Sequence, residues 1–195
     1  MIDTPPLRLN RSIVMVGLMG AGKTSIGRRL AQRLHVPFID SDAEIEKAAN
    51  ESIAEIFERA GEAVFRAGER RIIARLLDGP AQVLATGGGA FMDPATRARI
   101  RERGISVWLR ADLETLLERV TRRQHRPLLN EADPREVMIR LMAARHPVYA
   151  EADIAIDSLA GPSETTMLNL LAALAAWAGP SGVIDGRPDP QKVPS

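Results

Sequence analysis

A glycine-rich segment near the start of the chain carries the strongest chemical signal. Residues 17–24 read GLMGAGKT, which matches the spacing G-x-x-x-x-G-K-[ST] of a phosphate-binding loop. The glycines let successive backbone N–H groups turn toward a phosphate, Lys23 can reach the outer phosphate oxygens, and the Thr24 hydroxyl can ligate Mg²⁺. The motif stands between a strand-like apolar run, 12–16, and an amphipathic helical pattern, 23–34. A phosphate-binding loop requires this context, so the segment predicts a site for a nucleoside triphosphate.

Two acidic residues follow the next apolar run, 36–39. Asp40 and Asp42 come at the carboxyl end of this predicted strand, where open parallel sheets bind their ligands. They could serve Mg²⁺, a substrate hydroxyl, or one each. The alternative is structural, because Asp42 could cap a helix predicted over 43–49. The pair alone leaves both interpretations open, and phosphoryl transfer favours the chemical one, since a kinase for an alcohol needs a carboxylate that orients the hydroxyl.

Arginines dominate the basic side chains. Of the 26 basic residues, three are lysines and the other 23 are arginines. Guanidinium groups suit carboxylates and phosphates, which makes Arg66, Arg145 and the polar stretch 119–126 candidates. Most members of so large a set must be solvated surface residues, so without further context we expect each of these to be structural.

The composition limits the class of protein. A chain of 195 residues with 45% hydrophobic and 26% charged residues is typical of one folded domain. A net charge of +1 and 4% aromatic residues argue against a nucleic-acid or lipid partner. Cysteine is absent, which excludes disulfides and thiolate chemistry, and the three histidines lack metal-ligand spacing. With no apolar stretch of membrane-spanning length and no signal peptide pattern, we expect a cytoplasmic protein.

Short apolar runs alternate with helical patterns, and these elements must position the candidate residues. Strands are predicted at 12–16, 36–39, 83–85, 105–109 and 154–156. Helices are predicted at 23–34, 43–49, 52–57, 62–77, after the Asp93–Pro94 pair, 112–120 and 167–178. The alternation predicts an α/β protein with a parallel sheet covered on both faces. The polar stretch 121–134 predicts a mobile loop, and the tail 179–195, rich in glycine and proline, predicts disorder.

Six segments, taken in order, resemble the shikimate kinase family. They are GLMGAGKT, FIDSDAEIE, GEAVFRAGE, LATGGGA, RPLL and AARHPVY, and the resemblance runs from about Ile13 to Leu171. It implies a three-layer αβα P-loop fold with a central five-stranded parallel sheet. The chain then divides into a flexible start at 1–11, one kinase domain at 12–178 and a disordered tail at 179–195. Within the kinase domain, a helical substrate-binding subdomain spans about 42–80 and a mobile lid spans about 121–134.

The resemblance also implies a role for each matching residue. Asp42 would hold the acceptor hydroxyl, while Arg66 and Arg145 would clamp the shikimate carboxylate. Arg126 would reach the transferring phosphate from the lid, and Arg119 would stack on adenine. The implied ATP site comprises Gly20, Ala21, Gly22, Lys23, Thr24, Ser25, Arg119 and Arg126. The implied substrate site comprises Asp42, Phe57, Phe65, Arg66, Gly88, Gly89 and Arg145. The implied Mg²⁺ site comprises Thr24 and Asp40, and the implied catalytic residues are Lys23, Asp42 and Arg126.

The implied reaction is transfer of the ATP γ-phosphate to the 3-hydroxyl of shikimate, by a monomer that uses Mg²⁺, in the biosynthesis of aromatic amino acids. A small kinase for gluconate or a nucleotide is one alternative, but it does not predict Arg66 after Phe65 or the RPLL segment with an arginine downstream. An inactive nucleotide-binding module is another, and it has less need of an acid such as Asp42 beside an acceptor.

Overall fold

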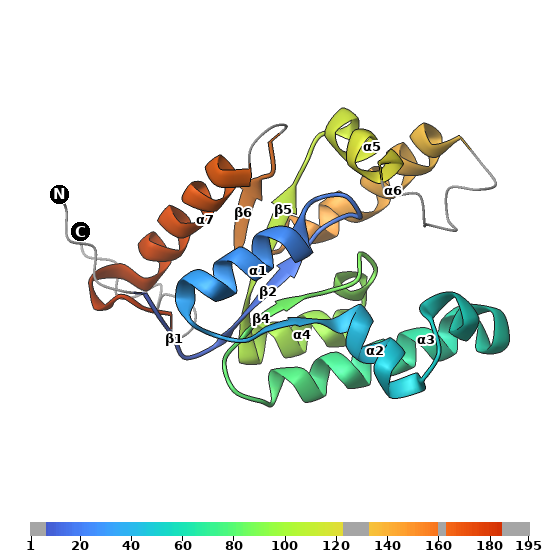
Figure 1. Ribbon diagram of the computed structural model, residues 1–195, viewed down its shortest axis with the longest axis horizontal. Coiled ribbons are helices and arrows are strands. Elements are labelled where there is room, and N and C mark those ends of the chain that lie inside the picture. The colour runs from blue at the N-terminus through green and yellow to red at the C-terminus, as the bar shows by residue number, and fades with distance from the viewer. Residues whose placement is uncertain (1–6, 123–132, 160–162, 185–195) are drawn as a thin grey trace.

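Five parallel strands form the central sheet of the protein, in the order β3-β4-β2-β5-β6 (Figure 1). The computed structural model describes residues 7–122, 133–159 and 163–184. The strands are β2 (Ser12–Val16), β3 (Phe38–Asp40), β4 (Val83–Ala85), β5 (Gly104–Arg110) and β6 (Ile154–Asp157). Every predicted strand is confirmed, with small shifts at the ends. Because β2 pairs with both β4 and β5, the strand that leads into the phosphate-binding motif lies at the centre of the sheet.

Helices cover both faces of this sheet, as the alternating pattern predicts. The helices are α1 (Lys23–Leu34), α2 (Ser41–Ala49), α3 (Ile53–Leu77), α4 (Pro94–Arg103), α5 (Leu113–Thr121), α6 (Pro134–Tyr149) and α7 (Ser163–Ala178). Helix α1 packs against β4 and α7, whereas α4 packs against β5 and α3. Figure 1 shows these two groups on opposite sides of the strands. The structure therefore confirms the three-layer αβα fold.

The apolar pattern explains how the central strand and its helix pack. All five residues of β2 are buried, and its apolar side chains are no more than 1% exposed. On α1, the buried stripe contains Ile26 and Leu30, at 2% and 0% exposure. Burial of each such side chain stabilises the fold by about 1.5–3 kcal/mol. The loop between β2 and α1 is thus held at both ends by the main core.

The predicted pair of helices at 52–57 and 62–77 forms one bent element, α3. Its start is a capping box, as the spacing predicts: the Glu55 N–H donates to Ser52 Oγ at 3.3 Å, and the Ser52 N–H donates to Glu55 Oε2 at 2.7 Å. The bend lies at Gly61, whose φ of 78° belongs to the left-handed region that glycine adopts without strain. In Figure 1, α2 and the first part of α3 extend away from the sheet.

Helix α6 is not among the predicted elements. Pro147 lies inside it and removes one helical N–H donor, which interrupts the sequence pattern. Asp133 caps its first turn by accepting a hydrogen bond from the Arg135 N–H at 2.9 Å. The expected lid, about 121–134, lies mostly outside the described residues, as does Arg126.

The two ends of the described chain pair with each other, which corrects part of the expectation for the termini. Strand β1 (Arg8–Leu9) and strand β7 (Val183–Ile184) form a small parallel sheet. A short 3₁₀ helix, η3 (Gly179–Ser181), comes just before β7. Ile184 is fully buried and belongs to the main core, and the partly buried Leu9 packs against this core. Disorder and flexibility are therefore wrong for these residues, because their apolar side chains have a core to join. The segment 185–195 lies outside the described residues.

No helix in the described part of the chain is long and apolar enough to span a lipid bilayer.

Candidate active site

The candidate residues gather at the carboxyl edge of the sheet. The glycine-rich loop follows β2, the acid pair lies at the end of β3, and the triple-glycine turn follows β4. These three strands are neighbours in the sheet, so their carboxyl ends meet at one edge. The topology thus brings together three motifs that are up to about seventy residues apart in the sequence, as expected for an open parallel sheet.

The loop between β2 and α1 has the backbone of a phosphate site. Gly17, Gly20 and Gly22 all have positive φ, and a Cβ at Gly17 would lie 2.6 Å from the Leu109 carbonyl oxygen. Lys23 Nζ donates to the Gly17 and Leu18 carbonyl oxygens, at 2.8 and 2.9 Å, so the ammonium group is held over the loop. The N-terminus of α1 adds the positive end of the helix dipole.

A cavity of about 330 Å³ opens beside this loop. Its lining includes Gly20, Gly22, Lys23, Thr24, Ser25, Arg119 and Arg122. Arg119 is fixed across it, since its Nη1 donates to Ser158 Oγ at 2.8 Å and its Nη2 donates to the Leu159 carbonyl oxygen at 2.6 Å. Ala21, by contrast, is 1% exposed and packs in the core. The structure therefore places Arg119 with the phosphate-loop residues.

Asp40 connects the loop to the acid pair. Its Oδ2 accepts a hydrogen bond from Thr24 Oγ1 at 3.0 Å, and its Oδ1 accepts one from the Asp42 N–H at 3.1 Å. The second contact makes Asp40 the N-cap of α2. The structural interpretation of Asp42 as the cap is therefore wrong, because the helix starts at Ser41 and the capping role falls to Asp40.

Asp42 is left with a carboxyl group in a poorly solvated, acidic environment. Burial raises its pKa to about 6, and the negative charges of Asp40 and Glu69 act in the same direction. The nearby Lys23 ammonium lowers the pKa but does not outweigh these effects. A carboxyl with a pKa this close to neutrality is suited to hold a hydroxyl and accept its proton.

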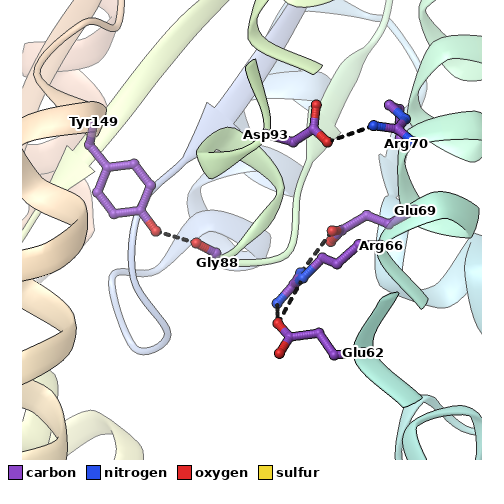
Figure 2. Close-up of polar contacts among 7 residues, drawn as sticks. All are labelled: Glu62, Arg66, Glu69, Arg70, Gly88, Asp93 and Tyr149. Atoms are coloured by element: carbon purple, nitrogen blue, oxygen red, sulfur yellow. Dashed lines mark hydrogen bonds and ion pairs between the residues drawn. The ribbon is translucent and has the colours of Figure 1, made fainter. Parts of the chain in front are cut away.

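Arg66 lies on α3, held between two acids on neighbouring turns of the helix. Its Nη1 donates to Glu69 Oε2 at 2.8 Å, and its Nη2 and Nε donate to Glu62 Oε1 at 3.1 and 3.2 Å (Figure 2). Glu69 is 3% exposed, and burial raises its pKa, an effect that the Arg66 partner only partly offsets. Sequence reasoning misses Glu69, although its i,i+3 spacing from Arg66 is a signal that could have found it.

The triple-glycine turn lies between the two predicted arginines. A Cβ at Gly89 would lie 2.6 Å from Arg66 Cζ, and a Cβ at Gly88 would lie 3.2 Å from Arg145 Nη1. A Cβ at Gly87 would lie 2.7 Å from Asp42 Oδ1. The missing side chains therefore let the backbone approach both guanidinium groups and the carboxyl group. Two cations and backbone N–H groups beside an acid can bind an anionic substrate that also carries a hydroxyl.

The two predicted phenylalanines pack together beneath Arg66. The ring centroids of Phe57 and Phe65 lie 4.6 Å apart, in a small cluster with Ile45 and Ile56. Phe65 is 5% exposed, and the Arg66 guanidinium lies 5.1 Å from its ring centroid. Phe57 is half-buried. This cluster supports α2 and α3 and thereby the positions of Asp42 and Arg66.

Comparison with known proteins places the chain in a well-defined group. A family model described as shikimate kinase matches residues 19–175. A shikimate kinase of Paramagnetospirillum magneticum is 59% identical over 170 residues, which cover 87% of this chain and 87% of that protein. A shikimate kinase of Novosphingobium aromaticivorans is 53% identical over 180 residues, covering 90% of this chain and 93% of that one.

Solved structures give the same result. The shikimate kinase from Acinetobacter baumannii in complex with shikimate superposes with a TM-score of 0.81 at 38% identity, covering 85% of this chain and 93% of that chain. A gluconokinase from Sinorhizobium meliloti matches with a TM-score of 0.60 at 22% identity, covering 87% of this chain and 94% of that chain. At that identity the second likeness shows a shared fold alone.

Proposed function

The chain belongs to the shikimate kinase family, and we propose that the residues at the carboxyl edge of its sheet carry out the family's reaction. That reaction moves the γ-phosphate of ATP to the 3-hydroxyl of shikimate and leaves ADP and shikimate 3-phosphate. The observation that supports the assignment of residues most strongly is the position of Arg66 and Arg145 on either side of the Gly88–Gly89 turn, next to Asp42.

In the proposed site, the shikimate carboxylate binds between Arg66 and Arg145. Guanidinium groups match the planar geometry of a carboxylate, and charge-assisted hydrogen bonds of this kind are about twice as strong as neutral ones. The N–H groups of Gly88 and Gly89 complete the binding site from the backbone. The solved relative with shikimate bound supports this acceptor, because its fold matches over 85% of the chain.

Asp42 is proposed to hold the acceptor hydroxyl and to accept its proton. With a pKa of about 6, the Asp42 carboxyl is ionised in most molecules at pH 7 and can accept a hydrogen bond and then the proton. Its position next to the Gly87 backbone places it within the same site as the carboxylate clamp. Asp42 would therefore orient the hydroxyl oxygen toward the phosphate while the clamp holds the other end of the substrate.

The phosphates of ATP are proposed to bind the loop from Gly20 to Ser25, with the base toward Arg119. Lys23 would exchange its contacts with loop carbonyls for phosphate oxygens and neutralise charge there. Arg126 is proposed to reach the transferring phosphate, although it lies outside the described residues. Preorganised positive charge of this kind stabilises the charge that spreads over the phosphoryl oxygens in the transition state.

Mg²⁺ fits the oxygen donors next to this loop. The Thr24 hydroxyl and the Asp40 carboxylate are hard oxygen groups 3.0 Å apart, which is the donor chemistry that this ion prefers. Thr24 would hold the ion directly and Asp40 would hold it through water. When bound, Mg²⁺ neutralises phosphate charge.

The experiment that tests this function is steady-state ADP release with Mg·ATP and a panel of acceptors: shikimate, gluconate, nucleoside monophosphates, and none. We expect shikimate-dependent turnover at about 1–100 s⁻¹, in the range typical of kinases, and little ADP without acceptor. Turnover with gluconate or a nucleotide instead would contradict the carboxylate clamp. ATP binding without turnover on any acceptor would contradict the assignment as an enzyme.

A further inference from the structure

A buried tyrosine hydroxyl contacts the triple-glycine turn from the side opposite Arg66. Tyr149, the last residue of α6, is fully buried, and its hydroxyl donates a hydrogen bond to the Gly88 carbonyl oxygen (Figure 2). The ring is held by aromatic neighbours, since the centroids of Trp108 and Phe91 lie 6.0 and 6.4 Å from its own. It is the only tyrosine of the chain. Its hydroxyl is therefore a fixed donor behind the proposed substrate site.

This hydrogen bond restrains a whole peptide unit. The Gly88 carbonyl and the Gly89 N–H belong to one planar trans peptide, so the two groups point in opposite directions. Three glycines in a row would otherwise allow this peptide to rotate, because glycine has more backbone freedom than any other residue. Anchoring the carbonyl on Tyr149 consequently aims the Gly89 N–H away from the tyrosine, toward the side where Arg66 lies.

Arg145 interacts with the same hydroxyl. Arg145 lies four residues before Tyr149 on α6, a spacing that places the two side chains on one face of the helix. Burial raises the pKa of Tyr149 to about 12, while the charge and hydrogen bond of Arg145 pull it down. The hydroxyl therefore keeps the proton that it donates to the Gly88 carbonyl oxygen, and the positive charge of Arg145 acts on the same group. One tyrosine is thus linked to two of the groups in the proposed clamp.

We propose that Tyr149 is a positioning residue for substrate binding, which fixes the Gly88–Gly89 peptide so that its N–H points at the substrate carboxylate. The proposal rests on the carboxylate clamp described above. Because the hydroxyl does not touch the reacting atoms, its removal should weaken the binding of the carboxylate and leave phosphoryl transfer itself nearly unchanged.

The test is Tyr149→Phe, which removes the hydroxyl and keeps the ring. We expect the KM for shikimate to rise about fivefold or more, since one hydrogen bond contributes about 1 kcal/mol, with kcat within about twofold and the KM for ATP unchanged. Ile105→Val is the matched control. Ile105 is fully buried at the amino end of β5, far from the carboxyl edge, and its truncation removes one buried methyl group, a change in the core as small as the loss of one hydroxyl. It should leave both KM values unchanged.

A second acceptor separates positioning from general loosening of the site. With the methyl ester of shikimate, which lacks the carboxylate charge, wild type and Tyr149→Phe should have similar KM values. An equal rise in KM for the acid and the ester, or no rise for either, would overturn the proposal. So would a loss confined to kcat.

The Arg145→Ala background separates the two contacts of the hydroxyl. If Tyr149 acts through the Gly88 peptide, Tyr149→Phe should still raise the KM for shikimate in that background. Disappearance of the effect there would mean that the tyrosine acts only through Arg145, which contradicts the proposed role. If Arg145→Ala itself leaves the KM unchanged, the clamp is wrong, and that result is distinct from failure of Tyr149 alone.

Discussion

The environment of Asp42 disfavours the charge of this residue and therefore opposes the stability of the fold. Its carboxyl group lies among Asp40, Glu69 and little water, so the charged form is disfavoured. A residue chosen only for folding would not be acidic here. The same surroundings give it a pKa of about 6, which suits a group that must accept a proton near neutral pH.

The pH dependence of the reaction should report this pKa. The carboxyl must be ionised to accept the proton of the acceptor hydroxyl, and it is mostly protonated below about pH 6. We expect kcat/KM for shikimate to be level above pH 7 and to fall about tenfold for each pH unit well below 6. Steady-state assays from pH 4.5 to 8.5 measure this.

Two variants identify the residue behind the profile. Asp42→Asn should lower kcat by about 10²–10⁴-fold and abolish the acidic limb, because the amide does not titrate. Glu58→Gln, an exposed acid on α3, should leave the profile unchanged. An acidic limb that survives in the Asp42 variant would assign the titration to another group.

Other residues of the site differ in how readily the sequence reveals them. Lys23 and Thr24 belong to a motif whose spacing states its chemistry. Guanidinium chemistry alone makes Arg66 and Arg145 no more than two candidates among 23 arginines, and only the resemblance gives them a role in binding the carboxylate. Glu69 and Tyr149 are not predicted at all, because their importance depends on contacts with Arg66 and Gly88 that only the folded chain creates.

Among the helices and strands, local sequence signals predict where helices start better than they predict which strands pair. Ser52 and Asp93 cap α3 and α4 as their spacing indicates. Asp40 caps α2 in place of Asp42, because nothing in a D-S-D sequence tells which acid will be free after the helix forms. The pairing of β1 with β7 escapes prediction since two-residue strands carry no periodicity, and it depends on a core that distant residues build.

The small terminal sheet should contribute to stability and not to catalysis. Ile184 on β7 is fully buried, so Ile184→Ala should lower the free energy of unfolding by about 2–4 kcal/mol through lost burial and a cavity. Leu168→Ala on α7 is the control, because this side chain is 58% exposed and should change stability by less than about 0.5 kcal/mol. Urea unfolding measures both variants.

The KM values for shikimate and ATP should be those of the wild type in both variants. Strand β1 ends just before β2 begins, so the β1–β7 sheet lies near the amino end of β2, whereas the candidate site lies at the carboxyl edge. Equal stability of the Ile184 and Leu168 variants would mean that the terminal sheet adds nothing to the fold.

In the whole molecule, the topology of the sheet brings the parts of the candidate site together. The strand order β3-β4-β2 places three loops side by side that are distant in sequence. Alternation of apolar strands and helices is sufficient to predict a parallel sheet, and the general rule for such sheets predicts the edge that binds ligands. The order of strands and the position of Arg145 opposite Arg66 depend on long-range packing, which short sequence patterns do not encode.

In the proposed complex, shikimate binds with its carboxylate between Arg66 and Arg145 and its reacting hydroxyl at Asp42. A crystal structure of the protein with shikimate and ADP tests it most directly. We predict carboxylate oxygens at about 2.7–3.2 Å from both guanidinium groups and from the Gly89 N–H, with a ring hydroxyl at a similar distance from Asp42. A carboxylate turned toward Lys23, or shikimate bound away from the triple-glycine turn, would contradict the account.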